Sequence, residues 1–197
     1  MSKRRFSVVQ VGGFRPTRDP FAGNFGMQPL ALPGEAWPAS GGKPMLYVCQ
    51  LNLTNAPAVP PRLADIKLIT FFVEPETATL SEENGDNWVL RVYKSLAGLA
   101  PLVAPPGAPK IRKGFECCWE ETSDAKAERT KIGGQGAYIQ SEPWWDYRAH
   151  PAAPAYCLQI NSEEKAGLAW GHAGTLYIAR GTADGCQDQW FLDIQFF

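Results

Sequence analysis

The stretch Tyr-Val-Cys-Gln-Leu-Asn at residues 47–52 returns near the end of the chain as Tyr-Cys-Leu-Gln-Ile-Asn at residues 156–161. A Gly-rich stretch with an aromatic residue precedes each copy, and an apolar, β-prone run follows each, at 68–73 and at 175–179. Two copies are too few for a solenoid, which needs about three or more stacked repeats. The pattern predicts instead a pseudo-twofold pair of related units inside one domain.

Short β-prone runs recur along the chain and are separated by turns. The 17 Pro and 19 Gly residues disfavour long helices, and the best helical turn is expected at 123–129, with Ser123 or Asp124 as its N-cap. The sequence therefore predicts a mainly β fold, leaning towards α+β. The expected strands are 1–13, 45–53, 66–73, 87–93, 111–121, 155–160, 175–180 and 190–197.

Composition sets the class of protein. With 45% hydrophobic and 20% charged residues, the chain has the make-up of an ordinary globular protein. No shift in composition marks a linker, so residues 1–197 are expected to form a single domain, with repeat-like halves at about 21–93 and 131–181. A formal net charge of −1 argues against a nucleic-acid-binding surface, which needs a basic stripe.

Two further features bear on location. No apolar run reaches the ~20 residues that cross a bilayer, and the segment after Lys3-Arg4-Arg5 is too short and too polar for a secretory signal. The five cysteines contain no Cys-x-x-Cys pair, which favours reduced thiols over a disulfide framework. A cytoplasmic protein that binds no membrane is expected.

Motifs of known catalytic sites are missing from the sequence. It contains no nucleophile elbow, zinc-protease motif, phosphate-binding loop or EF-hand loop. Only two histidines are present, and a Cys157–His172 pair is a weak alternative because a thiol inside an apolar strand stays protonated. We therefore expect a protein that is not an enzyme, without catalytic residues, cofactor or metal site.

Residues 142–151 combine three aromatic residues with charged ones between two prolines. Trp, Tyr and Arg dominate the binding energy of many protein interfaces, so Trp144, Trp145, Tyr147 and Arg148 are candidate partner-binding residues. The equal alternative is a loop that covers an edge of the core. An acidic stretch could steer a basic partner, although such stretches are usually solvated loops; it consists of Glu74, Glu76, Glu82, Glu83 and Asp86.

A second class of function is a small-molecule binding module with a polar site between the two repeats. Gln50 and Gln159 are polar residues in apolar strands, and buried amides must be hydrogen-bonded. Bonding to a neighbouring loop backbone is favoured over a shared polar pocket. Trp37 and Trp170 are more consistent with plugs of the core than with ligand stacking, and together with His172 they complete this alternative set.

The segments 25–38 and 43–53, with Trp37-Pro38 before the strand that carries Gln50, resemble the opening signature of the YwqG-like bacterial proteins. A second signature is matched at 131–134, 158–161 and 170–177. The family usually has Asp where this chain has His172, so any role of that carboxylate does not carry over. The resemblance implies a mainly β fold with an internal duplication. Some relatives are similar to immunity proteins that neutralise cognate bacterial toxins, including type VI secretion effectors. The resemblance therefore implies a protein toxin as the partner, and the acidic stretch would suit a basic one, such as a nuclease.

Overall fold

The computed structural model describes residues 5–75 and 80–196. Ten strands form one antiparallel sheet that is nearly closed on itself, in the order β14-β13-β12-β11-β1-β10-β2-β6-β7-β8. The mainly β fold and the single domain predicted from the sequence are confirmed. The strands are β1 (Phe6–Val11), β2 (Gly23–Phe25), β6 (Leu46–Asn52), β7 (Leu68–Val73), β8 (Trp88–Tyr93), β10 (Phe115–Thr122), β11 (Lys131–Ile132), β12 (Pro154–Asn161), β13 (Thr175–Gly181) and β14 (Trp190–Gln195).

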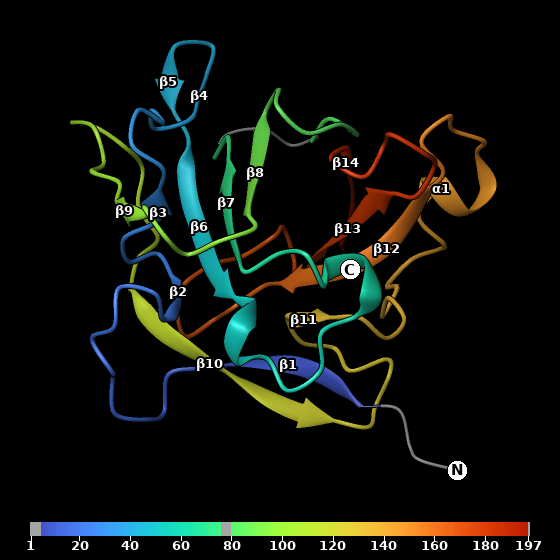
Figure 1. The fold of residues 1–197 in the computed structure, drawn as a ribbon, viewed down its shortest axis with the longest axis horizontal. Helices are drawn as coiled ribbons and strands as arrows, with labels where there is room; N and C mark the ends of the chain where they lie inside the picture. The colour runs from blue at the N-terminus through green and yellow to red at the C-terminus, as the bar shows by residue number, and fades with distance from the viewer. Residues whose placement is uncertain (1–4, 76–79, 197) are drawn as a thin grey trace.

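The sheet curves around a hydrophobic interior. In Figure 1, β6, β7 and β8 stand on one side, β12, β13 and β14 lie on the other, and β1 and β10 cross the base. Inward side chains fill the space between them: Phe71 packs against Trp88 at 6.0 Å and against Trp170 at 6.5 Å between ring centroids. The alternation along β8 places Trp88 and Leu90 in this core and leaves Val89 and Arg91 only partly buried, as a period of two requires.

The two ends of the sheet meet through Asn84, in the connection between β7 and β8. Its backbone N–H donates to the Trp190 carbonyl of β14 at 3.1 Å. Its side chain bonds both the N–H and the carbonyl of Leu90 in β8, at 2.8 and 3.0 Å. Glu82 and Glu83 extend the contact along β14. The segment 82–84 therefore connects the two edge strands, and Asn84 contacts both of them.

On each side of the central β1–β10 pair, four strands follow one another outward in chain order. Outward from β1 lie β11, β12, β13 and β14, and outward from β10 lie β2, β6, β7 and β8. A bulge interrupts β6 between Tyr47 and Cys49, and another interrupts β12 between Tyr156 and Leu158. This correspondence is compatible with an internal duplication, which itself stays a prediction.

Short elements complete the structure. Two 3₁₀ turns, η1 (Leu53–Asn55) and η2 (Pro61–Leu63), connect β6 to β7. The only α-helix of the described residues is α1 (Trp144–Tyr147). The remaining two-residue strands pair outside the main sheet, namely β3 (Leu30–Ala31) with β9 (Ala100–Pro101) and β4 (Ala39–Ser40) with β5 (Lys43–Pro44).

A strand forms within each of the eight predicted ranges, although residues 1–4 and 197 of the first and last ranges lie outside the described residues. The predicted helical turn at 123–129 does not form. That segment forms turns instead, and its Ala125 carbonyl accepts from Lys131 Nζ and from the Gln135 N–H. Seven residues are too few to offset the unfavourable nucleation of a helix. The strand expected from 111 begins only at Phe115. Within the described residues, no helix has the length and apolar character that a membrane crossing would require.

Candidate functional site

The segment that carries α1 folds onto the outer face of β13 and β14. Trp144 is only 5% exposed, and its Nε1 donates to the Leu192 carbonyl at 3.1 Å. Its ring meets Phe191 at 5.9 Å in an edge-to-face arrangement, the geometry that aromatic pairs prefer. Trp145, 7% exposed, packs in the same cluster with Tyr177.

The prediction that Trp144 and Trp145 anchor a partner is therefore wrong for the folded protein. Their indoles are already buried against β13 and β14, and exposing them would forfeit that burial. The alternative left open by the sequence, a loop that covers an edge of the core, describes them correctly. Their companion Tyr147 is different, because 72% of it is exposed.

The acidic stretch lies directly beside this aromatic segment. Arg148 stacks over the Trp144 ring at 4.2 Å and forms an ion pair with Glu82. His150 Nε2 lies 3.9 Å from Glu83 Oε1. The two sets of residues that the sequence offered separately thus meet on one surface. We call the surface formed by Glu82, Glu83, Glu142, Asp146, Tyr147, Arg148 and Asp193 the acidic face.

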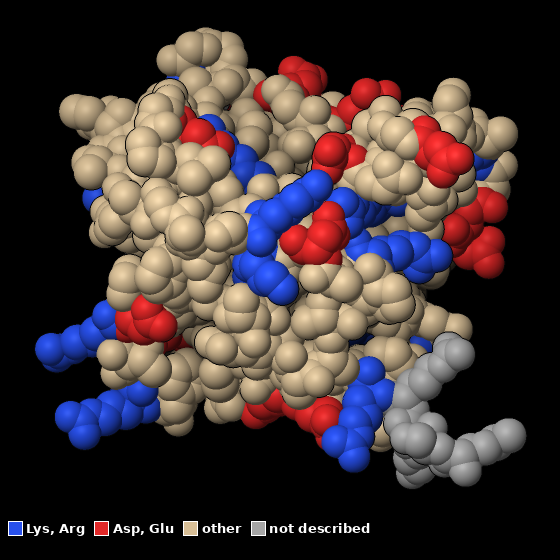
Figure 2. Space-filling model, viewed as in Figure 1, with Lys and Arg blue, Asp and Glu red and all other residues tan. Residues whose placement is uncertain are grey.

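Two carboxyl groups of the acidic face are held in an unfavourable environment. Burial raises the pKa of Asp193 above its ordinary value, and the charge of Glu82 adds to the effect. Burial and the neighbouring charge of Glu142 raise the pKa of Asp146 in the same way. Figure 2 shows carboxylates at the edge of the molecule where α1 lies in Figure 1. A raised pKa of this origin means that added positive charge would stabilise the ionised face.

The other acidic candidates are placed elsewhere. Glu74 accepts a hydrogen bond from Ser40 Oγ at 3.2 Å and lines a cavity at one end of the barrel. Asp86 is exposed in the turn before β8. Glu76 lies outside the described residues.

Gln50 and Gln159 do not share a pocket. Both side chains are fully buried on the outer face of the sheet, and each binds a different loop. Gln50 accepts from the Leu30 N–H and donates to the Pro20 and Ala22 carbonyls. Gln159 accepts from the Ala137 N–H and donates to the Arg129 carbonyl and to Asn161. The structure corrects the idea of a polar site between the repeats, because every donor of these amides already has a loop or side-chain partner.

The Trp37 side chain also has its contacts within the protein. Its Nε1 donates to the Met45 carbonyl at 2.9 Å, and its ring lies 5.2 Å from Phe72 on the outer face of β7. It packs in a cluster separate from that of Trp170. Trp37 therefore belongs to the structural set and lines none of the cavities described below.

Trp170 and His172 line a cavity of about 750 Å³ at one end of the barrel, here called the mouth cavity. The turn that carries them is closed by a hydrogen bond from the Gly174 N–H to the Trp170 carbonyl at 2.7 Å. Gly171 has a φ of +50°, and a Cβ there would lie 2.7 Å from Phe196. Only glycine fits at that position, because of its positive φ and because Phe196 packs closely against it. The turn therefore lies tightly against Phe196.

Cys157 is unsuited to nucleophilic chemistry. Burial raises the pKa of its thiol to about 11, and its Sγ lies 3.4 Å from the Ala155 carbonyl, so the reactive thiolate is scarce near neutral pH. No group of three or more His, Cys, Asp or Glu side chains that could hold a metal ion comes together in the described part of the chain.

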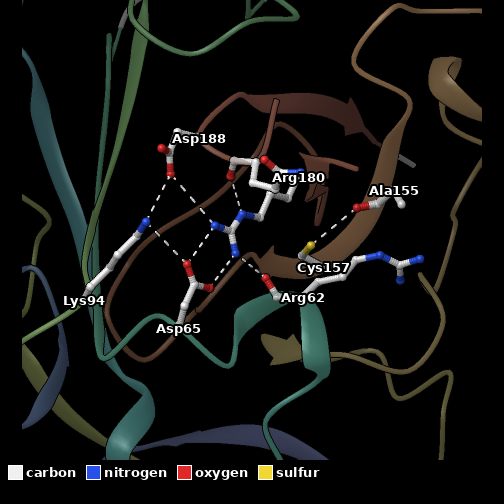
Figure 3. A network of polar contacts seen from close by, with 8 residues as sticks. Arg62, Asp65, Lys94, Ala155, Cys157, Arg180 and Asp188 are labelled. Carbon is white, nitrogen blue, oxygen red and sulfur yellow. Dashed lines mark hydrogen bonds and ion pairs between the residues drawn. The ribbon is translucent and has the colours of Figure 1, made fainter. Parts of the chain in front are cut away.

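A polar network beside Cys157 connects the two sides of the barrel (Figure 3). Arg180 of β13 donates to both carboxylate oxygens of Asp65, at 2.7 and 2.9 Å, and to the Arg62 carbonyl. Lys94 and Asp188 add longer contacts of 3.6 Å and more. Every donor and acceptor in the centre of the network has a protein partner, which is typical of a structural tie.

Residues that the sequence analysis missed include Arg180, Asp65, Asn84 and two cations at the mouth cavity, Lys110 and Arg112. The run Lys110-Ile111-Arg112-Lys113, in a Pro- and Gly-rich segment, was the available signal for the last two.

Comparisons with known proteins give no family for this chain. No protein-family model matches it, and no curated protein matches it.

Proposed function

We propose that the protein is a non-catalytic, cytoplasmic binding protein that neutralises a basic protein toxin by occlusion, as an immunity protein of the YwqG-like kind would block a type VI secretion nuclease effector. The observation that carries the proposal is the acidic face, where exposed Tyr147 stands among carboxylates whose repulsion is only partly relieved. The resemblance to YwqG-like proteins supplies the toxin as the kind of partner.

The charge of the acidic face favours a cationic partner. Arg148 is the only Lys or Arg of this face, and it already forms an ion pair with Glu82. Lysine or arginine side chains of a partner would relieve the repulsion between Asp146 and Glu142 and between Asp193 and Glu82. Complementary charge also raises the rate of association.

The position of Tyr147 favours a stable interface. Its helix is anchored by Trp144, which is hydrogen-bonded to Leu192 and stacked under Arg148. A side chain presented from a fixed platform loses little further freedom on binding, which preserves affinity. Tyr147 would enter a pocket of the partner, and the carboxylates would surround it.

The test is a binding measurement against the product of the adjacent gene, purified in an inactive form. We expect saturable one-to-one binding by calorimetry that weakens as salt is raised. Tyr147→Ser should weaken the affinity by roughly tenfold or more, as for an interface hot spot. Asp146→Asn should slow association.

Glu128→Gln is the matched control, because this exposed carboxylate lies outside the acidic face. It should leave binding unchanged. The proposal fails if neither the neighbouring product nor any protein in a lysate binds, or if Glu128→Gln weakens binding as much as Asp146→Asn.

A further inference from the structure

The mouth cavity differs from the acidic face in shape and in charge. It is built from both sides of the barrel, by Leu46 at the start of β6 and Val73 at the end of β7, and by Ile194 of β14 and Phe196 just after it. Its volume of about 750 Å³ falls within the roughly 300–1,000 Å³ of small-molecule sites.

The inner wall of the cavity is apolar. Leu168 is 4% exposed and Trp170 is 7% exposed, and both belong to the main hydrophobic core. The Trp170 Nε1 is buried and has no hydrogen-bond partner among the described residues. An unpaired buried donor is unfavourable, and this one belongs to a residue that lines the cavity.

The rim of the cavity carries two cations for which the described residues supply no partner. Lys110 and Arg112 line it, and neither forms a hydrogen bond or an ion pair within the described residues. Glu74 is the only carboxylate of the described lining, and it accepts from Ser40 Oγ. The stem of Arg112 lies close to Gly167, where a Cβ would be 2.9 Å from the Arg112 Cβ. The part of the rim that the structure describes therefore presents positive charge next to an apolar pocket.

We propose that the mouth cavity binds a small amphipathic anion, with its apolar body against Leu168, Trp170 and Phe196 and its carboxylate or sulfonate facing Lys110 and Arg112. Guanidinium and ammonium groups are the natural partners of such an anion. The site is separate from the acidic face, and it does not depend on the proposed function.

The first test uses two fluorescent probes with one skeleton. 8-Anilinonaphthalene-1-sulfonate carries the anionic group, and N-phenyl-1-naphthylamine lacks it. We expect saturable one-site binding of the sulfonate to the folded protein, weaker binding of the neutral probe, and displacement of the sulfonate by dodecanoate at much lower concentrations than by dodecanol. Lack of saturable binding up to about 100 μM, or equal displacement by the acid and the alcohol, overturns the proposal.

The second test separates charge from shape. Lys110→Ala/Arg112→Ala changes two exposed residues and should weaken sulfonate binding roughly tenfold while leaving the neutral probe unaffected. Lys67→Ala is the matched control, because this exposed lysine lies at the opposite end of β7 from Val73. A loss below about threefold, or the same loss for the neutral probe or for Lys67→Ala, overturns the assignment of the rim.

The third test fills the cavity. Ala169 is exposed and lines it, so Ala169→Trp should exclude both probes while the protein keeps its thermal unfolding midpoint. If a folded Ala169→Trp variant binds both probes as before, the probes lie elsewhere and the proposal is wrong.

Discussion

Gln50 in β6 and Gln159 in β12 hold the same place in the two halves of the barrel, and comparing their surroundings separates what repeats from what does not. Asn24 of β2 lies opposite Gln50, and Lys131 of β11 lies opposite Gln159. Each glutamine accepts from one loop N–H and donates to loop carbonyls. The repeated polar residues are therefore used for architecture, as the hydrogen bonding of buried amides requires.

The halves differ in what their loops carry outward. The segment held by Gln50 ends in Trp37, packed on Phe72. The segment held by Gln159 continues to α1 and exposes Tyr147. A residue that recurs in both halves is thus a poor guide to function, and the surfaces without a counterpart, the acidic face and the mouth cavity, are the better candidates.

The largest expected effect comes from removing the shared glutamines. Gln50→Leu and Gln159→Leu each leave one buried N–H and loop carbonyls unpaired, which should lower the free energy of unfolding by about 3 kcal/mol in either half. Guanidinium chloride unfolding measures both. The exposed Gln28→Leu should change it by less than about 0.5 kcal/mol. If only one of the two buried variants is destabilised, the two glutamines do not have the same structural role.

The next effect concerns the tie between the halves. Asp65→Asn leaves buried Arg180 without its carboxylate and should cost about 1–3 kcal/mol, less than a fully buried pair because Asp65 is partly exposed. The far more exposed Asp188→Asn should cost less than about 0.5 kcal/mol. Urea unfolding distinguishes them, and equal losses would contradict the tie.

The same pair sets a dependence on acid. The hydrogen bond from Arg180 lowers the pKa of Asp65, so the stabilisation is present above the ordinary pKa of about 3.9 and is lost as the pH falls through the lowered one. Asp65→Asn should remove this part of the acid sensitivity.

A smaller effect should appear in only one half. Burial lowers the pKa of Lys131 to about 8, whereas its counterpart Asn24 does not titrate. Between about pH 8 and 10.4, the unfolded chain binds the proton that the folded protein has released, so stability rises with pH. Lys131→Met should abolish this rise in thermal melts at pH 7.5, 9 and 10, and Asn24→Ser should retain it. A rise that persists in Lys131→Met would contradict the assignment.

The smallest effect is expected on the acidic face. Tyr147→Ser alters an exposed side chain and should change the free energy of unfolding by less than about 0.5 kcal/mol, although we expect it to weaken partner binding strongly. Trp144→Ala provides the contrast, with a loss of about 3–5 kcal/mol. Substantial destabilisation by Tyr147→Ser would show that this residue, too, belongs to the cover of the sheet.

The sequence was sufficient for the strands and insufficient for the contacts between distant segments. Apolar runs such as 68–73 and 175–179 identify strands because their pattern is local. The aromatic content of 142–151 was equally compatible with a cover and with an interface, because side-chain type alone does not tell which face a tryptophan buries. The burial of the Trp144 ring depends on its contacts with Leu192 and Phe191, which lie 48 and 47 positions away in the chain.

The cations of the mouth cavity illustrate the same limit. Lys110 and Arg112 stand in an irregular, Pro-rich segment without a periodic pattern, and they meet Trp170 only once the barrel has closed. Trp170 and His172 line one cavity. Gln50, Gln159 and Trp37, which the sequence grouped with them, face the outside of the sheet instead.

Asn84 has a consequence for behaviour at high concentration. Open strand edges present unpaired N–H and carbonyl groups that can pair with a strand of another molecule and lead to aggregation. Here one amide occupies the Leu90 groups of β8, while the backbone beside it occupies β14. This short segment thus leaves few backbone groups free for intermolecular strand addition. Breaking its contacts would expose the edges of β8 and β14 together.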